Sequence, residues 1–207
     1  HLLMLKEAEG GWNKELDNTI EGSTLDYFKV KNIDDVGSKE VIVGIGMAKD
    51  EPNKQLFIYE NIDNKLMEKV HRGYEVIDID DYNEDNRPDL FIIDGEKNVS
   101  ETAEMLSYDK SGLKSISAVQ LDPSVYYENI VSGKLLDGKK ALFIDGGVGA
   151  HSLVTEIITF NEGKLIKVGK ENDKILFKAY QLYSRDINND GIIEVGGMYI
   201  PKGYENA

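Results

Sequence analysis

The stretch that decides the fold is "DYNEDNRPDLFIIDG", residues 81–95, in which an oxygen-rich loop runs directly into a short apolar segment. A second stretch, "DINNDGIIEV" at residues 186–195, has the same order of features. In both, side chains that carry oxygen stand at the first, third, fifth and ninth positions: Asp81, Asn83, Asp85 and Asp89, then Asp186, Asn188, Asp190 and Glu194. Two matching loops, each followed by an apolar run, indicate a repeated unit.

This spacing is typical of a calcium loop. Calcium takes six to eight oxygen ligands at about 2.3–2.6 Å, and alternate residues of a tight loop can converge on one point. The sixth position is Gly191 in one loop and Asn86 in the other, and both residue types tolerate a left-handed backbone. The loops begin like EF-hands, but the twelfth residue of the second is Gly197 where an EF-hand needs a bidentate Glu.

The alternative is a pair of acidic surface turns, because Asp, Asn and Gly are also turn formers. We favour calcium because the match occurs twice. The predicted ligands of the first of two Ca²⁺ sites are Asp81, Asn83, Asp85, Asp89 and the backbone carbonyl of Arg87. Those of the second are Asp186, Asn188, Asp190, Glu194 and the backbone carbonyl of Ile192.

Composition excludes several function classes. The chain has 207 residues and a formal charge of −14, which argues against binding to nucleic acid or to anionic lipid. It contains no Cys and no run of eighteen apolar residues, so we predict no disulfide, no thiolate metal site and no transmembrane segment. Because the first residue is His1, we expect a piece of a longer protein whose export signal or lipid anchor lies outside it.

Internal repeats predict the architecture. Apolar runs that begin at residues 40, 89, 140 and 194 recur about every fifty residues, and strand–turn–strand patterns recur with the same period. The resulting units cover approximately residues 1–49, 50–99, 100–150 and 151–207 of a single domain. Four strands per unit of about fifty residues are typical of a propeller blade.

We therefore predict an all-β fold, a β-propeller-like array of about four four-stranded antiparallel blades that belongs to a propeller of five or more blades. An irregular β-sandwich is the alternative. A ring of four blades closed by its own termini would require the strand with Leu3 and Leu5 to pair with the strand after Glu194. We prefer a propeller that continues before His1 and after Ala207.

The other two units have incomplete loops. Residues 32–40 keep Asn32, Asp34 and Glu40, but Val36 stands at the fifth position. In the third unit, Asp137-Gly138 suits a tight hairpin turn and Lys140 stands at the ninth position. We predict that these two loops bind no metal ion.

The chain resembles the FG-GAP/VCBS repeat family, whose integrin-type propellers carry calcium loops of the form D-x-[DN]-x-[DN]-G-x-x-D. "DINNDGIIE" departs from this form by Glu for the last Asp, and "DYNEDNRPD" by Asn for Gly. The stretches "GKKALFIDGGVGAHSLVTEIITF" and "YSRDINNDGIIEV" are similar to FG-GAP repeat lipoproteins of Gram-positive bacteria. The resemblance implies a lipid-anchored or secreted β-propeller without established catalysis.

Other chemistry is weakly indicated. The three histidines, His1, His71 and His151, lie too far apart in sequence for a zinc motif. Ser152 and His151 are neighbours in an expected strand and would point to opposite faces. We interpret six tyrosines as packing between blades rather than as a binding surface: Tyr126, Tyr127, Tyr180, Tyr183, Tyr199 and Tyr204. Trp12 stands where the other hairpins have Leu66, Leu113 and Leu165, so we predict that it is a core residue.

The function that we expect is that of a calcium-binding extracytoplasmic β-propeller, a binding or scaffold module with structural calcium. Its ligand would be a protein or a carbohydrate at the cell surface, and we assign no catalytic residue. One alternative is a propeller hydrolase or lyase that acts on polysaccharide, since a glycosidase needs only a pair of carboxylates. The other is a purely structural repeat domain.

Overall fold

The computed structural model describes residues 2–46, 54–63, 65–94, 102–149, 152–168, 175–179 and 182–196. Regular structure in these ranges consists of β-strands, and no helix there is long and apolar enough to cross a membrane. The strands are β1 (Leu2–Ala8), β2 (Gly11–Asn18), β3 (Thr24–Lys31), β4 (Glu40–Gly46), β5 (Lys54–Ile62), β6 (Lys65–Tyr74), β7 (Val76–Asp80), β8 (Asp89–Ile93), β9 (Thr102–Asp109), β10 (Gly112–Gln120), β11 (Tyr126–Lys134), β12 (Lys140–Gly147), β13 (Ser152–Asn161), β14 (Lys164–Lys167) and β15 (Ile175–Ala179). The all-β prediction is confirmed.

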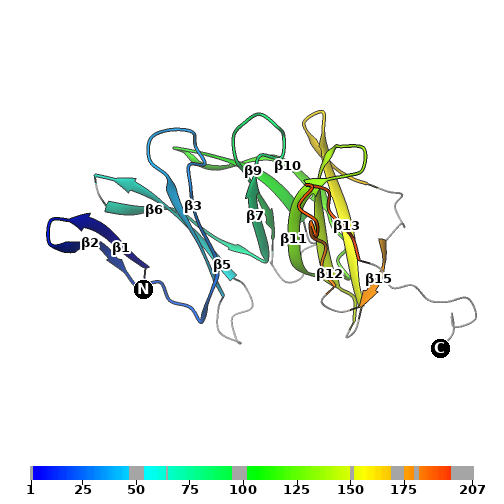
Figure 1. The fold of residues 1–207 in the computed structure, drawn as a ribbon, viewed down its shortest axis with the longest axis horizontal. Helices are drawn as coiled ribbons and strands as arrows, with labels where there is room; N and C mark the ends of the chain where they lie inside the picture. Colours follow the sequence, from blue (N-terminus) through cyan, green and yellow to red (C-terminus); the bar gives the residue numbers. More distant parts are fainter. Residues whose placement is uncertain are drawn as a thin grey trace, which may run out of the picture.

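Three sheets repeat one antiparallel meander. Their strand orders are β3-β4-β5-β6, β7-β8-β9-β10 and β11-β12-β13-β14, and β15 pairs with the remaining length of β13. The sheets follow one another in chain order across the molecule (Figure 1). Equivalent strands of neighbouring sheets contact each other, as β7 does β11 and β10 does β14.

The second strand of each sheet contains a run of consecutive apolar residues because both of its faces are covered. In β8, Leu90 and Ile92 pack toward the sheet that contains β3, whereas Phe91 and Ile93 pack toward the sheet that contains β11. All four side chains are fully buried. Such a strand reads as a continuous apolar run, which explains why these segments dominate the repeat in the sequence.

Polar side chains also join neighbouring sheets. The donors and acceptors lie on equivalent strands, 48 to 52 residues apart. The pairs are Lys29 Nζ with the carbonyl oxygen of Ile79 (2.9 Å), the Tyr108 hydroxyl with Glu60 Oε1 (2.7 Å), Ser132 Oγ with Asp80 Oδ2 (2.9 Å) and the Leu165 amide with Ser117 Oγ (2.9 Å). Each sheet is therefore tied to the next at corresponding places.

The two ends of the array are partial sheets. β1 and β2 form a two-stranded sheet, and near the other end Arg185 and Glu194 form a single antiparallel bridge. Among the described residues, β1 pairs only with β2, so the strand with Leu3 and Leu5 does not join residues 182–196 in a closed ring. The expectation of about four complete four-stranded sheets is met by three.

Trp12 contradicts its prediction, because its side chain is 67% exposed. The corresponding Leu66 and Leu165 are buried in hairpins that belong to complete sheets. Among the described residues, the β1–β2 hairpin pairs with no further strand, and β2 contacts β6, so the hairpin lacks the complete sheet that covers the other two.

The tyrosines divide between packing and exposure. Tyr127 is buried in the core between the second and third sheets, as predicted, whereas its neighbour Tyr126 is exposed. The Tyr183 hydroxyl donates a hydrogen bond to Glu128 Oε2 at 2.7 Å. Tyr180, Tyr199 and Tyr204 lie outside the described residues, as do His1 and His151.

Candidate functional site

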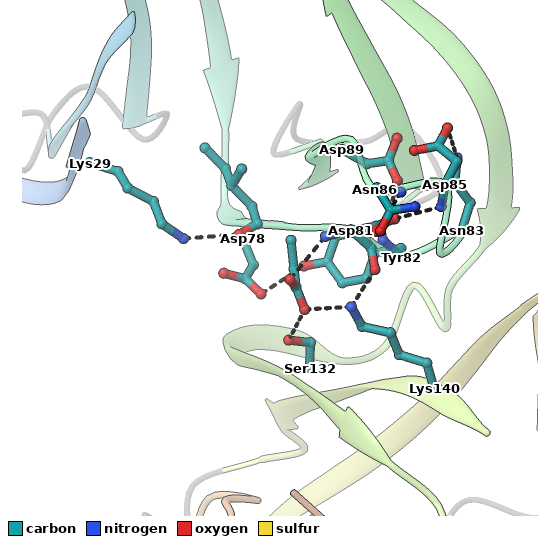
Figure 2. A network of polar contacts seen from close by, with 12 residues as sticks. Lys29, Asp78, Asp81, Tyr82, Asn83, Asp85, Asn86, Asp89, Ser132 and Lys140 are labelled. Carbon is teal, nitrogen blue, oxygen red and sulfur yellow. Dashed lines mark hydrogen bonds and ion pairs between the residues drawn. The ribbon is translucent and has the colours of Figure 1, made fainter. Parts of the chain in front are cut away.

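The loop at residues 81–89 joins the first two strands of the second sheet, β7 and β8. Its oxygen-bearing side chains fold inward onto backbone amides (Figure 2). Asp81 accepts from the amides of Asp85 (3.1 Å) and Asn86 (2.8 Å), Asn83 from Asp85 (3.0 Å), Asp85 from Arg87 (2.8 Å) and Asp89 from Tyr82 (3.2 Å). The side chains at positions one, three, five and nine thus define the loop.

The loop at residues 186–194 has the same network. Asp186 accepts from the amides of Asp190 (3.2 Å) and Gly191 (2.8 Å), Asn188 from Asp190 (3.0 Å), Asp190 from Ile192 (2.7 Å) and Glu194 from Ile187 (2.8 Å). In both loops the Asn amide also donates to the fifth-position Asp at 3.0 Å. Glu194, although its side chain is longer, therefore accepts a hydrogen bond from the second residue of its loop, as Asp89 does in the first loop.

The fourth and sixth residues of both loops have left-handed backbones. The φ angles are 60° at Glu84 and 68° at Asn86 in one loop, and 62° at Asn189 and 84° at Gly191 in the other. This conformation turns successive amides toward the first carboxylate, and it favours glycine or Asn at the sixth position.

Replacing Gly191 with Ala is expected to lower the free energy of unfolding by about 1–2 kcal/mol, the usual cost of a left-handed L-residue. An added Cβ would meet no atom within 4 Å, so the cost is conformational rather than steric. The midpoint of urea unfolding measures it. Asn86→Gly is the control and should change that free energy by less than about 0.5 kcal/mol. An equally small change in Gly191→Ala would contradict the argument.

The first loop places two other carboxylates close to a buried one. Asp89 is 3% exposed. Burial, and then the charges of Asp85 and Asp81, raise the pKa of Asp89 from 3.8 to about 6, although the amides of Tyr82 and Asn83 lower it. A cation beside these three carboxylates would favour their ionised forms.

The donor set fits calcium in its chemistry. Each loop offers three carboxylates, one amide oxygen and the carbonyl of the seventh residue, and hard cations prefer such oxygen ligands. An ionised carboxylate has about four lone-pair sites, so the amide hydrogen bonds leave capacity for an ion. Within the described residues, no group of three or more His, Cys, Asp or Glu side chains is placed so that it could hold a metal ion.

The loop at residues 32–40 keeps this shape with fewer donors. Glu40 Oε2 accepts from the Ile33 amide at 2.7 Å, and Asp34 Oδ1 accepts from the Val36 amide at 2.8 Å. Val36 itself is exposed and offers no side-chain oxygen. Burial, and then the charge of Asp34, raise the pKa of Glu40 against the amide hydrogen bond from Ile33. The loop shape therefore does not depend on a complete ligand set.

In the third unit, residues 135–139 form the predicted tight turn. The Leu135 amide donates to the Lys139 carbonyl at 2.9 Å, and Gly138 has a φ of 83°. No oxygen-rich loop forms in this unit between β11 and β12, because the connection is too short.

Lys140 has a role that the sequence did not reveal. Its ammonium reaches the preceding unit, where it pairs with Asp80 Oδ2 at 2.7 Å and donates to the carbonyl oxygen of Asp81 (Figure 2). It lies 5.6 Å from the centre of the Tyr82 ring. Burial would raise the pKa of Asp80, but hydrogen bonds from Lys140 and Ser132 hold it below 3.8. Lys140 thus anchors the start of the 81–89 loop.

A second anchor is a buried carboxylate on β12. Asp145 is fully buried and accepts hydrogen bonds from Thr155 Oγ1 (2.5 Å), the Ser184 amide (2.6 Å), Ser184 Oγ (2.9 Å) and Asn129 Nδ2 (3.0 Å). Ser184 lies two residues before Asp186, so Asp145 fixes the chain that enters the second loop. The only signal in the sequence is an acid that interrupts the apolar run "ALFIDGG".

A scan against protein-family models and a search among curated proteins both find no match to this chain.

Proposed function

We propose that this chain is a calcium-binding β-propeller module that acts as a binding or scaffold unit outside the cytoplasm. The observation that carries the proposal is the shared geometry of the loops at residues 81–89 and 186–194. They differ at most positions but have the same side-chain-to-amide network, set by the residues predicted as ligands. The resemblance to FG-GAP/VCBS repeats supports the same ion at both loops.

Calcium would be held by the side chains at positions one, three, five and nine and by the seventh carbonyl, with water completing its shell. The ion would neutralise carboxylates that otherwise repel one another, and so would stabilise the fold rather than take part in catalysis. Extracellular modules commonly bind calcium at about 0.1–1 mM. Sites of that affinity are suited to a secreted or lipid-anchored protein.

The arrangement of the sheets supports a propeller of five or more blades. Three complete sheets lie in sequence, with equivalent strands in contact. The β1–β2 hairpin corresponds to the outer half of a further blade, and residues 184–194 correspond to the inner half of another. Three complete and two partial sheets give five, since the two halves do not pair with each other among the described residues.

The proposal predicts two bound calcium ions per chain. Asp81→Ala and Asp186→Ala should each bind one ion, because each removes the first ligand and the acceptor of two loop amides. Isothermal titration calorimetry with calcium chloride measures the stoichiometry. Asp137→Ala is the matched control, because it removes an acid from the tight turn of the third unit and should leave two ions. Wild-type stoichiometry in either loop variant would refute the assignment of that loop.

A further inference from the structure

A cavity of about 470 Å³ opens beside the 81–89 loop, between that loop and the strands β12 to β14 of the third sheet. Its volume falls in the range of about 300–1,000 Å³ that is usual for small-molecule sites. The charged residues that line it are Lys139, Lys140, Lys167 and Glu84. Three ammonium groups against one carboxylate reverse the balance of a chain with 38 acidic and 24 basic residues.

Two of these lysines can present an ammonium group to a ligand. Lys139 pairs with Asp137 at 3.1 Å, but the two side chains are 73% and 53% exposed. Lys167 pairs with Glu156 at 3.2 Å, and these two side chains are 37% and 13% exposed. Exposed ion pairs contribute at most about 1 kcal/mol, so an anionic ligand can compete with Asp137 for Lys139. Lys167 keeps its half-buried partner, but an ammonium has three donors, so it can bind Glu156 and a ligand together.

Lys140 contributes to the cavity in a different way. It is bound to Asp80 and to the Asp81 carbonyl, which hold it in the wall between the second and third sheets. Asp80 offsets its charge, so Lys140 supplies a fixed N–H donor rather than a net positive potential. The cavity thus combines one rigid ammonium donor with two others.

The uncharged lining suits a sugar. Asn83, Asn161 and Thr159 offer amide and hydroxyl groups, which can exchange hydrogen bonds with sugar hydroxyls. Phe160, Ile166 and Val168 offer an aromatic ring and apolar surface for the C–H groups of a pyranose ring. Among the described lining residues there is no Arg and no helix N-terminus, the usual means of bidentate and backbone phosphate recognition.

We infer that this cavity binds a short saccharide that carries carboxylate groups, such as an oligosaccharide of uronic acids. The inference rests on the proposed function, since it gives the binding module a ligand class and places the site beside a calcium loop. Ammonium groups would pair with the sugar carboxylates, and the amides and the ring would recognise the sugar itself.

The test is calorimetric titration of the calcium-loaded protein with tri-galacturonic acid, with a protein-free blank to remove the heat of calcium–sugar contact. The fully methyl-esterified trisaccharide is the matched ligand without charge. Wild type should bind the acid at one site and bind the ester at least about tenfold more weakly, since charge-assisted hydrogen bonds are lost. Lys139→Gln and Lys167→Gln should each weaken binding of the acid by about tenfold.

Lys114→Gln is the control variant, because Lys114 is an exposed lysine paired with Asp109 and does not line the cavity. It should bind the acid as wild type does. Equal binding of acid and ester, or unchanged binding in both cavity variants, would overturn the inference, as would full competition by inorganic phosphate. If the protein binds two calcium ions but no saccharide, the saccharide site is wrong and the calcium proposal stands. If it binds the saccharide but no calcium, the calcium proposal is wrong and the saccharide site stands.

Discussion

Chelation of calcium is expected to lower the melting temperature by about 5–10 °C for each loop. A ligand present at a hundred times its dissociation constant, and bound only by the folded state, adds about 2.7 kcal/mol of stability. For a chain of 150–250 residues, each kcal/mol corresponds to about 2–4 °C. The effect should be this large because three carboxylates lie within each nine-residue loop, and one of those in the first loop, Asp89, is buried. Thermal unfolding followed by circular dichroism, with calcium and then with EDTA, measures it.

The control is a protein that lacks both sites. The double variant Asp81→Ala/Asp186→Ala should melt at the same temperature with calcium and with EDTA, and magnesium should replace calcium poorly because it demands smaller octahedral sites. The far-UV spectrum below the transition should stay that of a β-protein throughout. A wild-type sample that is shown to be metal-free yet melts at the calcium-loaded temperature would exclude a structural role for the ion.

Asp145→Ala is expected to lower the free energy of unfolding by about 3 kcal/mol or more. The substitution leaves donors of Thr155, Ser184 and Asn129 without this acceptor in the protein interior, and each unsatisfied buried donor costs about 1–3 kcal/mol. It should also weaken calcium binding at residues 186–194 while leaving residues 81–89 unaffected. Urea unfolding and calcium calorimetry measure the two effects.

Asp137→Ala is again the matched control, since Asp137 is an exposed acid in the turn between β11 and β12, and its loss should change stability by less than about 0.5 kcal/mol. A second variant, Ser184→Ala, removes only one of the donors and should have a smaller effect of the same kind. If Asp145→Ala unfolds at the wild-type urea concentration, the carboxylate does not anchor the second loop.

The sequence predicted the sheets because their central strands are buried on both faces. A run such as "LFIIDG" needs no knowledge of its neighbours to be recognised as an interior strand. The loops were found for a similar reason: their donors lie within nine residues, and their hydrogen bonds are local. Spacing alone then predicts which side chains come together.

Contacts between units were beyond the reach of sequence patterns. Lys140 was interpreted through its own unit, where it occupies a ligand position, but its ammonium binds the preceding loop 59 residues earlier. Asp145 and Ser184 are 39 residues apart, and neither stands in a recognisable motif. Trp12 matched its repeat position, yet its exposure depends on whether a complete sheet surrounds the hairpin. Periodicity gives the order of strands but not which side chains meet across two sheets.

The hydrogen bonds between neighbouring sheets have a consequence for cooperativity. Each one described above joins corresponding strands about one repeat apart, so a unit depends on the unit before it and the unit after it. The total stability is then close to a sum of unit terms and nearest-neighbour terms, as in a one-dimensional chain of coupled elements. Loss of order should begin at the terminal elements, which have one neighbour, and move inward. For the same reason, whole units can be duplicated or deleted during evolution without the invention of a new kind of contact.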